Sequence, residues 1–206
     1  MIELAPGLQY CPEFYDRAQQ RLLVEAVAAV IEEAPLFTPR MPRTGKAFSV
    51  RMTNCGDLGW VSDAERGYRY EPAHPETGKP WPVIPDLALK SWRDLVAAPA
   101  MPEACLVNLY EPGARMGLHQ DRDELALDIP VVSISLGAEC LFRFGGTNRR
   151  GPTQSVRLRS GDVIVIGGPS RLCFHGVDKI YPGTSQLVEG GGRINLTLRR
   201  VGLQSS

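Results

Sequence analysis

Histidine is scarce in this chain, and cysteine has no regular pattern. The 206 residues include three histidines and five cysteines, and no two cysteines stand in CxxC spacing. An odd, scattered set of cysteines favours reduced thiols over a disulfide framework or a zinc knuckle. No apolar run reaches the roughly 20 residues that a membrane span needs, and the first residues lack the basic and apolar regions of a signal peptide. We therefore expect a cytoplasmic protein with no membrane partner.

Net charge is also absent, because 23 Lys and Arg residues balance 23 Asp and Glu residues. Taken alone, this balance argues weakly against a nucleic-acid partner. The charges are unevenly spread, however, since residues 34–56 and 140–161 contain no acidic residue but several arginines. These stretches predict either one positive face or two arginine-rich strand edges that face solvent, and charge alone favours the second.

The hydrophobic pattern predicts two helices followed by a β-rich region. Apolar residues recur at helical spacing over 16–34, with Asp16 as the expected N-cap, and a second helix is expected over 86–98. Residues 1–15 look irregular, and the loop-rich, aromatic segment 54–85 predicts either a satellite core or a lid. Strands are expected over 47–53, 104–110, 115–119, 130–136, 140–144, 155–159, 162–166, 172–175 and 193–200. The last eight, with no helix between them, favour a jelly roll or closed barrel in one domain.

One stretch brings a histidine and a carboxylate two residues apart, at His119 and Asp121. On an extended backbone residues i and i+2 point to the same face, so both side chains can approach one point. They make two thirds of a facial triad, the two-histidine, one-carboxylate set that holds non-haem Fe(II). His175, which follows a predicted strand, is the expected third ligand. His74 lies in a proline-flanked loop and is expected at the surface.

Two predicted strands carry alternating polar side chains. Over 193–199 the polar face comprises Arg193, Asn195, Thr197 and Arg199, and over 104–110 it comprises Asn108 and Tyr110. Taken singly, each strand is typical of a half-buried strand with its polar face in water. Near an iron triad, the amide, phenol and guanidinium groups together predict a pocket for a dicarboxylate, because the planar fork of arginine binds a carboxylate bidentately.

Several motifs follow one another in order along the chain. They are Asn108-x-Tyr110, His119-x-Asp121-x-Asp123-Glu124, Gly161-Asp162, Ser170-Arg171, His175-Gly176 and Arg193-x-Asn195-x-Thr197-x-Arg199. In this order they resemble the AlkB family of Fe(II)/2-oxoglutarate-dependent dioxygenases, over roughly residues 41–200. The His-x-Asp element alone occurs in many oxygenases, but the whole series is specific.

The resemblance implies a mainly β fold with flanking helices, in a single domain of residues 1–206. Its core would be a double-stranded β-helix (jelly roll) over 103–200, with a nucleotide-recognition lid over 35–85. Iron would be held by His119, Asp121 and His175. The 2-oxoglutarate ligands, with Arg199 on the distal carboxylate, would be Asn108, Tyr110, Arg193, Asn195 and Arg199. The nucleotide contacts, with Trp60 stacked on the base opposite His119, would be Trp60, Tyr68, Tyr70, Asp123 and Arg149.

The activity implied by the resemblance is oxidative demethylation of 1-methyladenine and 3-methylcytosine in DNA, using O2 and releasing formaldehyde and succinate. These methylated bases are cationic, so a carboxylate such as Asp123 would separate them from the neutral normal bases. The base must be single-stranded or flipped out, because its methyl group is hidden inside a duplex. Two alternatives stay open: the same chemistry on RNA, and a cupin-like metal-binding module without turnover. Nothing requires more than a monomer.

Overall fold

The computed structural model describes residues 1–98 and 100–202, which form two antiparallel sheets, a hairpin and two α-helices. In spatial order, the larger sheet contains β1 (Ile2–Ala5), β2 (Leu8–Cys11), β11 (Val163–Ile166), β8 (Val131–Gly137), β13 (Arg193–Arg199), β6 (Ala104–Tyr110) and β3 (Arg51–Gly56). The smaller sheet contains β10 (Thr153–Leu158), β9 (Glu139–Gly145), β12 (His175–Tyr181) and β7 (Met116–His119). Short 3-10 turns occur at Gly168–Ser170 and Glu189–Gly191.

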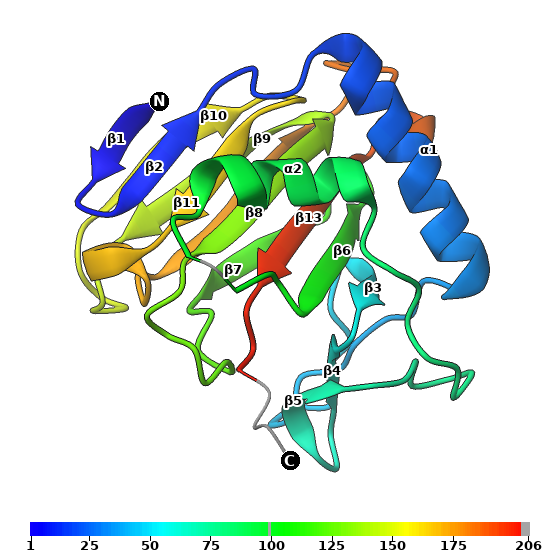
Figure 1. Cartoon of the computed structure of the whole chain (residues 1–206). Coiled ribbons are helices and arrows are strands. Elements are labelled where there is room, and N and C mark those ends of the chain that lie inside the picture. The colour runs from blue at the N-terminus through cyan, green and yellow to red at the C-terminus, as the bar shows by residue number, and fades with distance from the viewer. Residues whose placement is uncertain (99, 203–206) are drawn as a thin grey trace.

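The two sheets face each other across a hydrophobic core (Figure 1). Leu106 and Ile164 of the larger sheet belong to the same buried cluster as Phe142 and Val177 of the smaller sheet. Side chains alternate between the two faces of a strand, so each strand also sends residues to the outer face. Packed antiparallel sheets of this kind form a jelly roll, which confirms the predicted fold class.

Both helices cover the outer face of the larger sheet (Figure 1). Helix α1 (Arg17–Glu33) has Asp16 as its N-cap. The Asp16 carboxylate accepts the Gln19 N–H at 2.8 Å, while the Gln19 side chain accepts the Asp16 N–H at 3.1 Å. This reciprocal capping box satisfies two backbone donors that the helix itself cannot. Helix α2 (Asp86–Leu95) buries Trp92 beside the same sheet. The helices thus supply a second core and leave the inner face of the sheet for the site.

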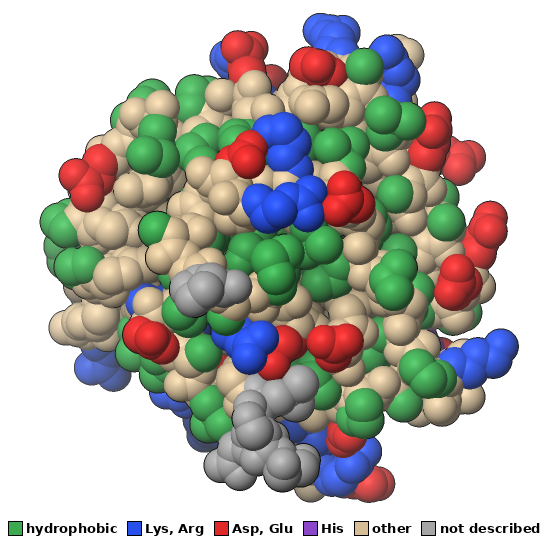
Figure 2. Space-filling view, in the orientation of Figure 1, with side chains coloured by type: hydrophobic (Ala, Val, Ile, Leu, Met, Phe, Trp, Pro, Cys, Tyr) green, Lys and Arg blue, Asp and Glu red, His purple; other side chains and the backbone are tan. Residues whose placement is uncertain are grey.

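The surface over the helices carries charges of both signs (Figure 2). Acidic and basic side chains are interspersed there, so this face is not a single positive surface. Among the described residues, no helix is long and apolar enough to cross a membrane.

The prediction that residues 1–15 are irregular was wrong. Strands β1 and β2 lie there, and β2 pairs along its whole length with β11. The Tyr10 hydroxyl donates a 2.8 Å hydrogen bond to Asp162, which fastens this edge to the sheet. The strand predicted over 172–175 was also misplaced, because β12 begins at His175 and pairs with both β9 and β7.

The loop-rich segment 54–85 contains a hairpin that the sequence did not predict. It is formed by β4 (Gly59–Asp63) and β5 (Gly67–Glu71). The Asp63 carboxylate accepts the N–H groups of Glu65 and Arg66, and Gly67 has a φ of 73°, which favours glycine. The hairpin pairs Trp60 directly with Tyr70 and projects from the jelly roll (Figure 1).

Candidate active site

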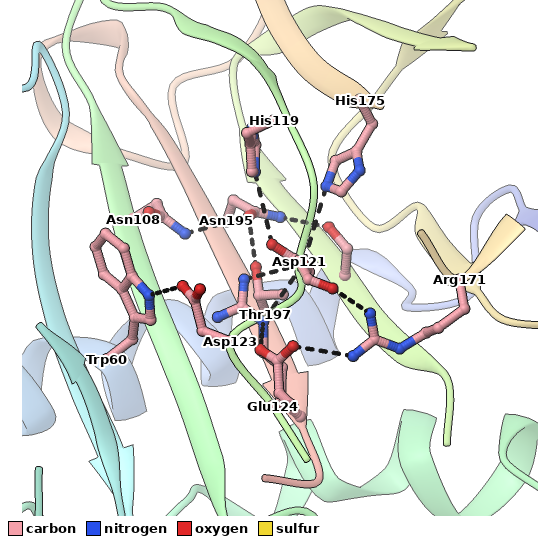
Figure 3. Close-up of polar contacts among 12 residues, drawn as sticks. Trp60, Asn108, His119, Asp121, Asp123, Glu124, Arg171, His175, Asn195 and Thr197 are labelled. Atoms are coloured by element: carbon pink, nitrogen blue, oxygen red, sulfur yellow. Dashed lines mark hydrogen bonds and ion pairs between the residues drawn. The ribbon is translucent and has the colours of Figure 1, made fainter. Parts of the chain in front are cut away.

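His119, Asp121 and His175 meet at one point between the sheets. His119 is the last residue of β7 and His175 the first of β12, and the two stand opposite each other in the strand register. Their Nε2 atoms lie 3.7 and 3.9 Å from the two oxygens of the Asp121 carboxylate, and all three ligand atoms are within 4.8 Å of one another. The side chains converge as a facial triad requires (Figure 3).

The backbone fixes which nitrogen of each histidine faces the triad. The Nδ1 atom of His119 lies 2.9 Å from the Gly117 carbonyl, and that of His175 lies 3.1 Å from the Cys173 carbonyl. Each Nδ1 therefore carries the proton and donates it, which leaves the Nε2 lone pair free for a metal. Burial lowers the pKa of His175 to about 4, so this imidazole is neutral at pH 7, as a ligand must be.

The third ligand, Asp121, is buried and held ionised by its neighbours. Burial alone would raise the pKa of Asp121, but Arg199 and then the two triad histidines bring it well below its usual range. The Arg199 Nη2 atom lies 3.0 Å from the Asp121 carboxylate. The carboxylate is thus available as an anionic ligand at neutral pH.

The polar faces of β13 and β6 line the same cavity as the triad. The cavity measures about 830 Å³, and the predicted cosubstrate residues in its wall are Asn108, Tyr110, Arg193, Asn195 and Arg199. The interpretation that these faces point into water was wrong for these two strands, since the Arg193 residue is 1% exposed. Strands β13 and β6 are both interior strands of the sheet, and the smaller sheet covers their inner face.

Four buried polar atoms in this wall have no hydrogen-bond partner among the described residues. They are Arg193 Nε and Nη1, Arg199 Nη1 and Asn108 Oδ1. Buried guanidinium N–H groups are costly unless something accepts their hydrogen bonds, and a carboxylate is the acceptor that fits the arginine fork best. The cavity wall therefore fits an acidic cosubstrate beside a metal.

An aromatic wall closes another side of the cavity. The indole of Trp60 stacks on Tyr68, with ring centroids 5.4 Å apart and planes inclined by 23°, and meets the edge of Phe48. Its Nε1 donates a 2.9 Å hydrogen bond to the Asp123 carboxylate (Figure 3). Trp60, Tyr68, Asp123 and Arg149 all line the cavity. The structure thus brings four of the five predicted nucleotide contacts to the mouth of the metal site.

The burial of His74 differs from the prediction. His74 was expected at the surface but is 2% exposed. Its Nε2 atom lies 2.7 Å from the Pro35 carbonyl, and its Nδ1 accepts the N–H groups of Glu76 and Thr77. Both ring nitrogens have hydrogen-bond partners, so His74 has a structural role and lies outside the triad.

Residues 7–199 match the family model described as the 2OG-Fe(II) oxygenase superfamily. The alpha-ketoglutarate-dependent dioxygenase AlkB homolog of Caulobacter vibrioides is 57% identical over 199 residues, covering 97% of this chain and 90% of that protein. The chain belongs to the AlkB family. The AlkB dioxygenase of Escherichia coli is 40% identical over 207 residues, covering 97% and 92%. The solved structure of OsALKBH1 is 32% identical, with a TM-score of 0.78, and covers 97% of this chain and 99% of its own.

In this AlkB-family dioxygenase, the triad offers a ligand set that fits Fe(II), and the unpartnered arginine atoms suit 2-oxoglutarate. Tyr70 is placed differently from the other predicted nucleotide contacts. It is not among the described residues that line the cavity, and its hydroxyl donates a short hydrogen bond to Glu124.

Sequence reasoning assigned no role to Glu124 or Arg171, although both stand in the motifs. The Glu124 residue is 4% exposed, and its carboxylate meets the Arg171 Nη2 atom at 3.0 Å. A buried charge needs a partner, and the partners of Glu124 are distant in the chain: Arg171 is 47 residues away and Tyr70 is 54 residues away. The one signal in the sequence was the position of Glu124, directly after Asp123 and three residues after Asp121.

Proposed function

We propose that this dioxygenase removes methyl groups oxidatively from 1-methyladenine and 3-methylcytosine in DNA, and so repairs alkylation damage directly. The observation that carries the proposal is the carboxylate of Asp123, which stands on the aromatic wall of the cavity that contains the triad. A base methylated at these positions is cationic, so a fixed carboxylate attracts it more strongly than a neutral base. Trp60 offers the flat apolar surface on which such a base can stack.

When bound, Fe(II) and 2-oxoglutarate supply the oxidising chemistry with O2, converting the N-methyl carbon to formaldehyde and the keto acid to succinate and CO2. The chain supplies position and charge. His119, Asp121 and His175 would hold the metal through two imidazoles and one carboxylate. Asp121 and His175 are buried, which strengthens the electrostatic contacts that they make in the cavity.

We propose that Arg193, rather than Arg199, binds the distal carboxylate of 2-oxoglutarate. Two nitrogens of Arg193 are buried without a partner among the described residues, and Arg193 stands opposite Tyr110 in the register. Arg199 is already engaged, with Nη2 at 3.0 Å from Asp121 and Nε at 3.3 Å from Glu124. Its one unpartnered nitrogen, Nη1, therefore lies beside the metal ligand, where the carboxylate nearer the metal would be.

The two acid-free stretches support a nucleic-acid partner. Lys46 comes from the first stretch and Arg149 from the second, and both line the cavity together with Arg115. None of the three forms an ion pair with another described residue, so each is available to a phosphate. We propose that residues 35–85, which include the hairpin, act as the nucleotide-recognition lid over a flipped or single-stranded base. The protein would act as a monomer in the cytoplasm, where its five buried cysteines stay reduced.

The test is formaldehyde release from a single-stranded DNA oligonucleotide with one 1-methyladenine, in the presence of Fe(II) and 2-oxoglutarate. His119→Ala should abolish release, and an unmethylated oligonucleotide should give none. Parallel assays on methylated duplex DNA and RNA rank the substrates. Iron binding without formaldehyde or DNA-stimulated succinate from any of them would instead support a binding module.

A further inference from the structure

We propose that Glu124 is a positioning residue that ties the nucleotide-recognition hairpin to the iron and cosubstrate site, through Tyr70 on one side and Arg171 and Arg199 on the other. The proposal rests on the proposed function for the identity of the substrate, but the tie itself is a feature of the fold. It also gives Tyr70 a role other than contact with the nucleotide.

Glu124 sits at the centre of a buried polar cluster. One carboxylate oxygen accepts a hydrogen bond from Arg171 Nη2 at 3.0 Å. The other accepts the Tyr70 hydroxyl and lies 3.3 Å from Arg199 Nε. The side chains of Glu124, Arg171 and Arg199 are 2%, 5% and 7% exposed. Each charge is compensated only by its neighbours, because bulk water does not reach it.

Arg171 connects this cluster to the metal ligand through the backbone. Its Nε donates to the Ile129 carbonyl at 2.9 Å, and its Nη1 donates to the carbonyl of Asp121. One guanidinium therefore fixes the loop near residue 129 as well as the main chain of Asp121 and the Glu124 carboxylate. Figure 3 shows Arg171 beside Asp121 and Glu124. Asp121, Glu124, Arg171 and Arg199 together carry no net charge, so the cluster is balanced as a unit.

Tyr70 connects the cluster to the aromatic wall. It lies in β5, where the register pairs it with Trp60 of β4. Its own phenol is held in the neutral form, because burial raises the pKa of Tyr70 well above its usual range. The same hairpin therefore presents Trp60 to the cavity and Tyr70 to Glu124.

Loss of the Tyr70 hydroxyl should weaken the binding of 2-oxoglutarate. Glu124 would then draw more strongly on Arg199, its remaining partner on that oxygen. Arg199 also contacts Asp121 at 3.0 Å, so a shift of its guanidinium would disturb the site of the keto acid and leave the Trp60 surface in place. We expect the KM for 2-oxoglutarate to rise about three- to tenfold, as the loss of one hydrogen bond to a charged group allows.

The experiment compares Tyr70→Phe with Tyr10→Phe. Tyr10 also donates a hydrogen bond to a buried carboxylate, that of Asp162, but on β2 near the far edge of the larger sheet. For each protein one measures the KM for 2-oxoglutarate, the KM for the 1-methyladenine oligonucleotide, the ratio of succinate to formaldehyde, and the melting temperature.

Tyr70→Phe should raise the KM for 2-oxoglutarate and the ratio of succinate to formaldehyde, with the KM for the oligonucleotide unchanged, while Tyr10→Phe changes none of the three. A rise in the oligonucleotide KM alone would show that Tyr70 contacts the nucleotide, and would overturn the proposal. Equal effects of both substitutions, or no kinetic effect of Tyr70→Phe, would overturn it as well.

Arg171 provides a second measurement that does not depend on the nucleic-acid substrate. Titration of 2-oxoglutarate into the Fe(II) protein without oxygen, followed by the charge-transfer absorption of the complex, gives its affinity directly. Arg171→Met should weaken this affinity, and Arg171→Lys should restore part of it, because lysine keeps the charge but not the fork. Equal affinities for wild type and both variants would contradict the tie. If wild type binds the keto acid but demethylates nothing, the proposed function fails while this test still stands.

Discussion

The indole N–H of Trp60 donates a 2.9 Å hydrogen bond to the carboxylate of Asp123. The two residues come from different parts of the chain: Trp60 lies in strand β4 of the hairpin, and Asp123 lies in the segment between β7 and β8. The bond uses one carboxylate oxygen and leaves the other for a ligand. Since Trp60 also contacts the rings of Tyr68 and Phe48, the aromatic surface and the negative charge form one preorganised unit.

Asp123→Asn should lower kcat/KM for a 1-methyladenine oligonucleotide by about 10- to 100-fold, because it removes a charge-assisted hydrogen bond to a cationic base. The amide oxygen can still accept the Trp60 N–H, so the aromatic wall stays in place. A neutral lesion such as 1-methylguanine is the matched control, and the kcat/KM for it should fall much less. An equal loss on both oligonucleotides would show that Asp123 does not select by charge.

Substitution of the two cosubstrate arginines separates their roles. Arg193→Met should raise the KM for 2-oxoglutarate by about 30-fold or more and leave turnover of a 2-oxo acid without a distal carboxylate, such as 2-oxobutyrate, nearly unchanged. Arg199→Met also removes a partner of Asp121, so it should weaken iron binding and the use of both keto acids. KM values for the two acids and iron titrations measure these effects. If Arg199→Met instead impaired only the use of 2-oxoglutarate, and Arg193→Met impaired both keto acids, Arg199 would be the residue that binds the distal carboxylate.

The local pattern of the sequence was enough to group the residues of the cavity wall on one face, and the nearby His-x-Asp motif was needed to predict that this face lines a pocket. Strict alternation over 193–199 placed Arg193 and Arg199 on one face, and the structure confirms that face as the cavity wall. A strand allows only two faces, so a period of two settles the orientation once the strand exists. For the same reason, the His-x-Asp spacing was sufficient to predict that the side chains of His119 and Asp121 approach one point.

The local sequence pattern could not predict contacts between distant segments. The burial of His74 depends on the Pro35 carbonyl, 39 residues away, and proline-flanked histidines give no sign of such a partner. Strands β1 and β2 have four residues each, too few to show a period. The ring of Tyr70 could stack on a base, and its hydroxyl could donate to a buried carboxylate. Only the fold shows that the hydroxyl donates to Glu124.

Tyr15 should make the free energy of unfolding depend on pH in alkaline solution. Its ring is fully buried and its hydroxyl donates to the Leu87 carbonyl at 2.9 Å. Burial raises the pKa of Tyr15 to about 12 in the folded protein, from an ordinary value near 10. Between these values the unfolded chain releases a proton that the folded chain retains. The stabilising contribution is therefore complete below about pH 10 and is lost as the pH rises toward 12.

Tyr15→Phe isolates this effect, because phenylalanine fills the same space without an ionisable group. At about pH 9 the variant should be less stable than wild type by about 1 kcal/mol, through loss of the hydroxyl's hydrogen bonds. Above about pH 10 wild type should lose stability faster than the variant, so the difference narrows. Urea unfolding at a series of pH values measures both proteins. A difference that stays constant up to about pH 12 would show that Tyr15 keeps an ordinary pKa in the fold.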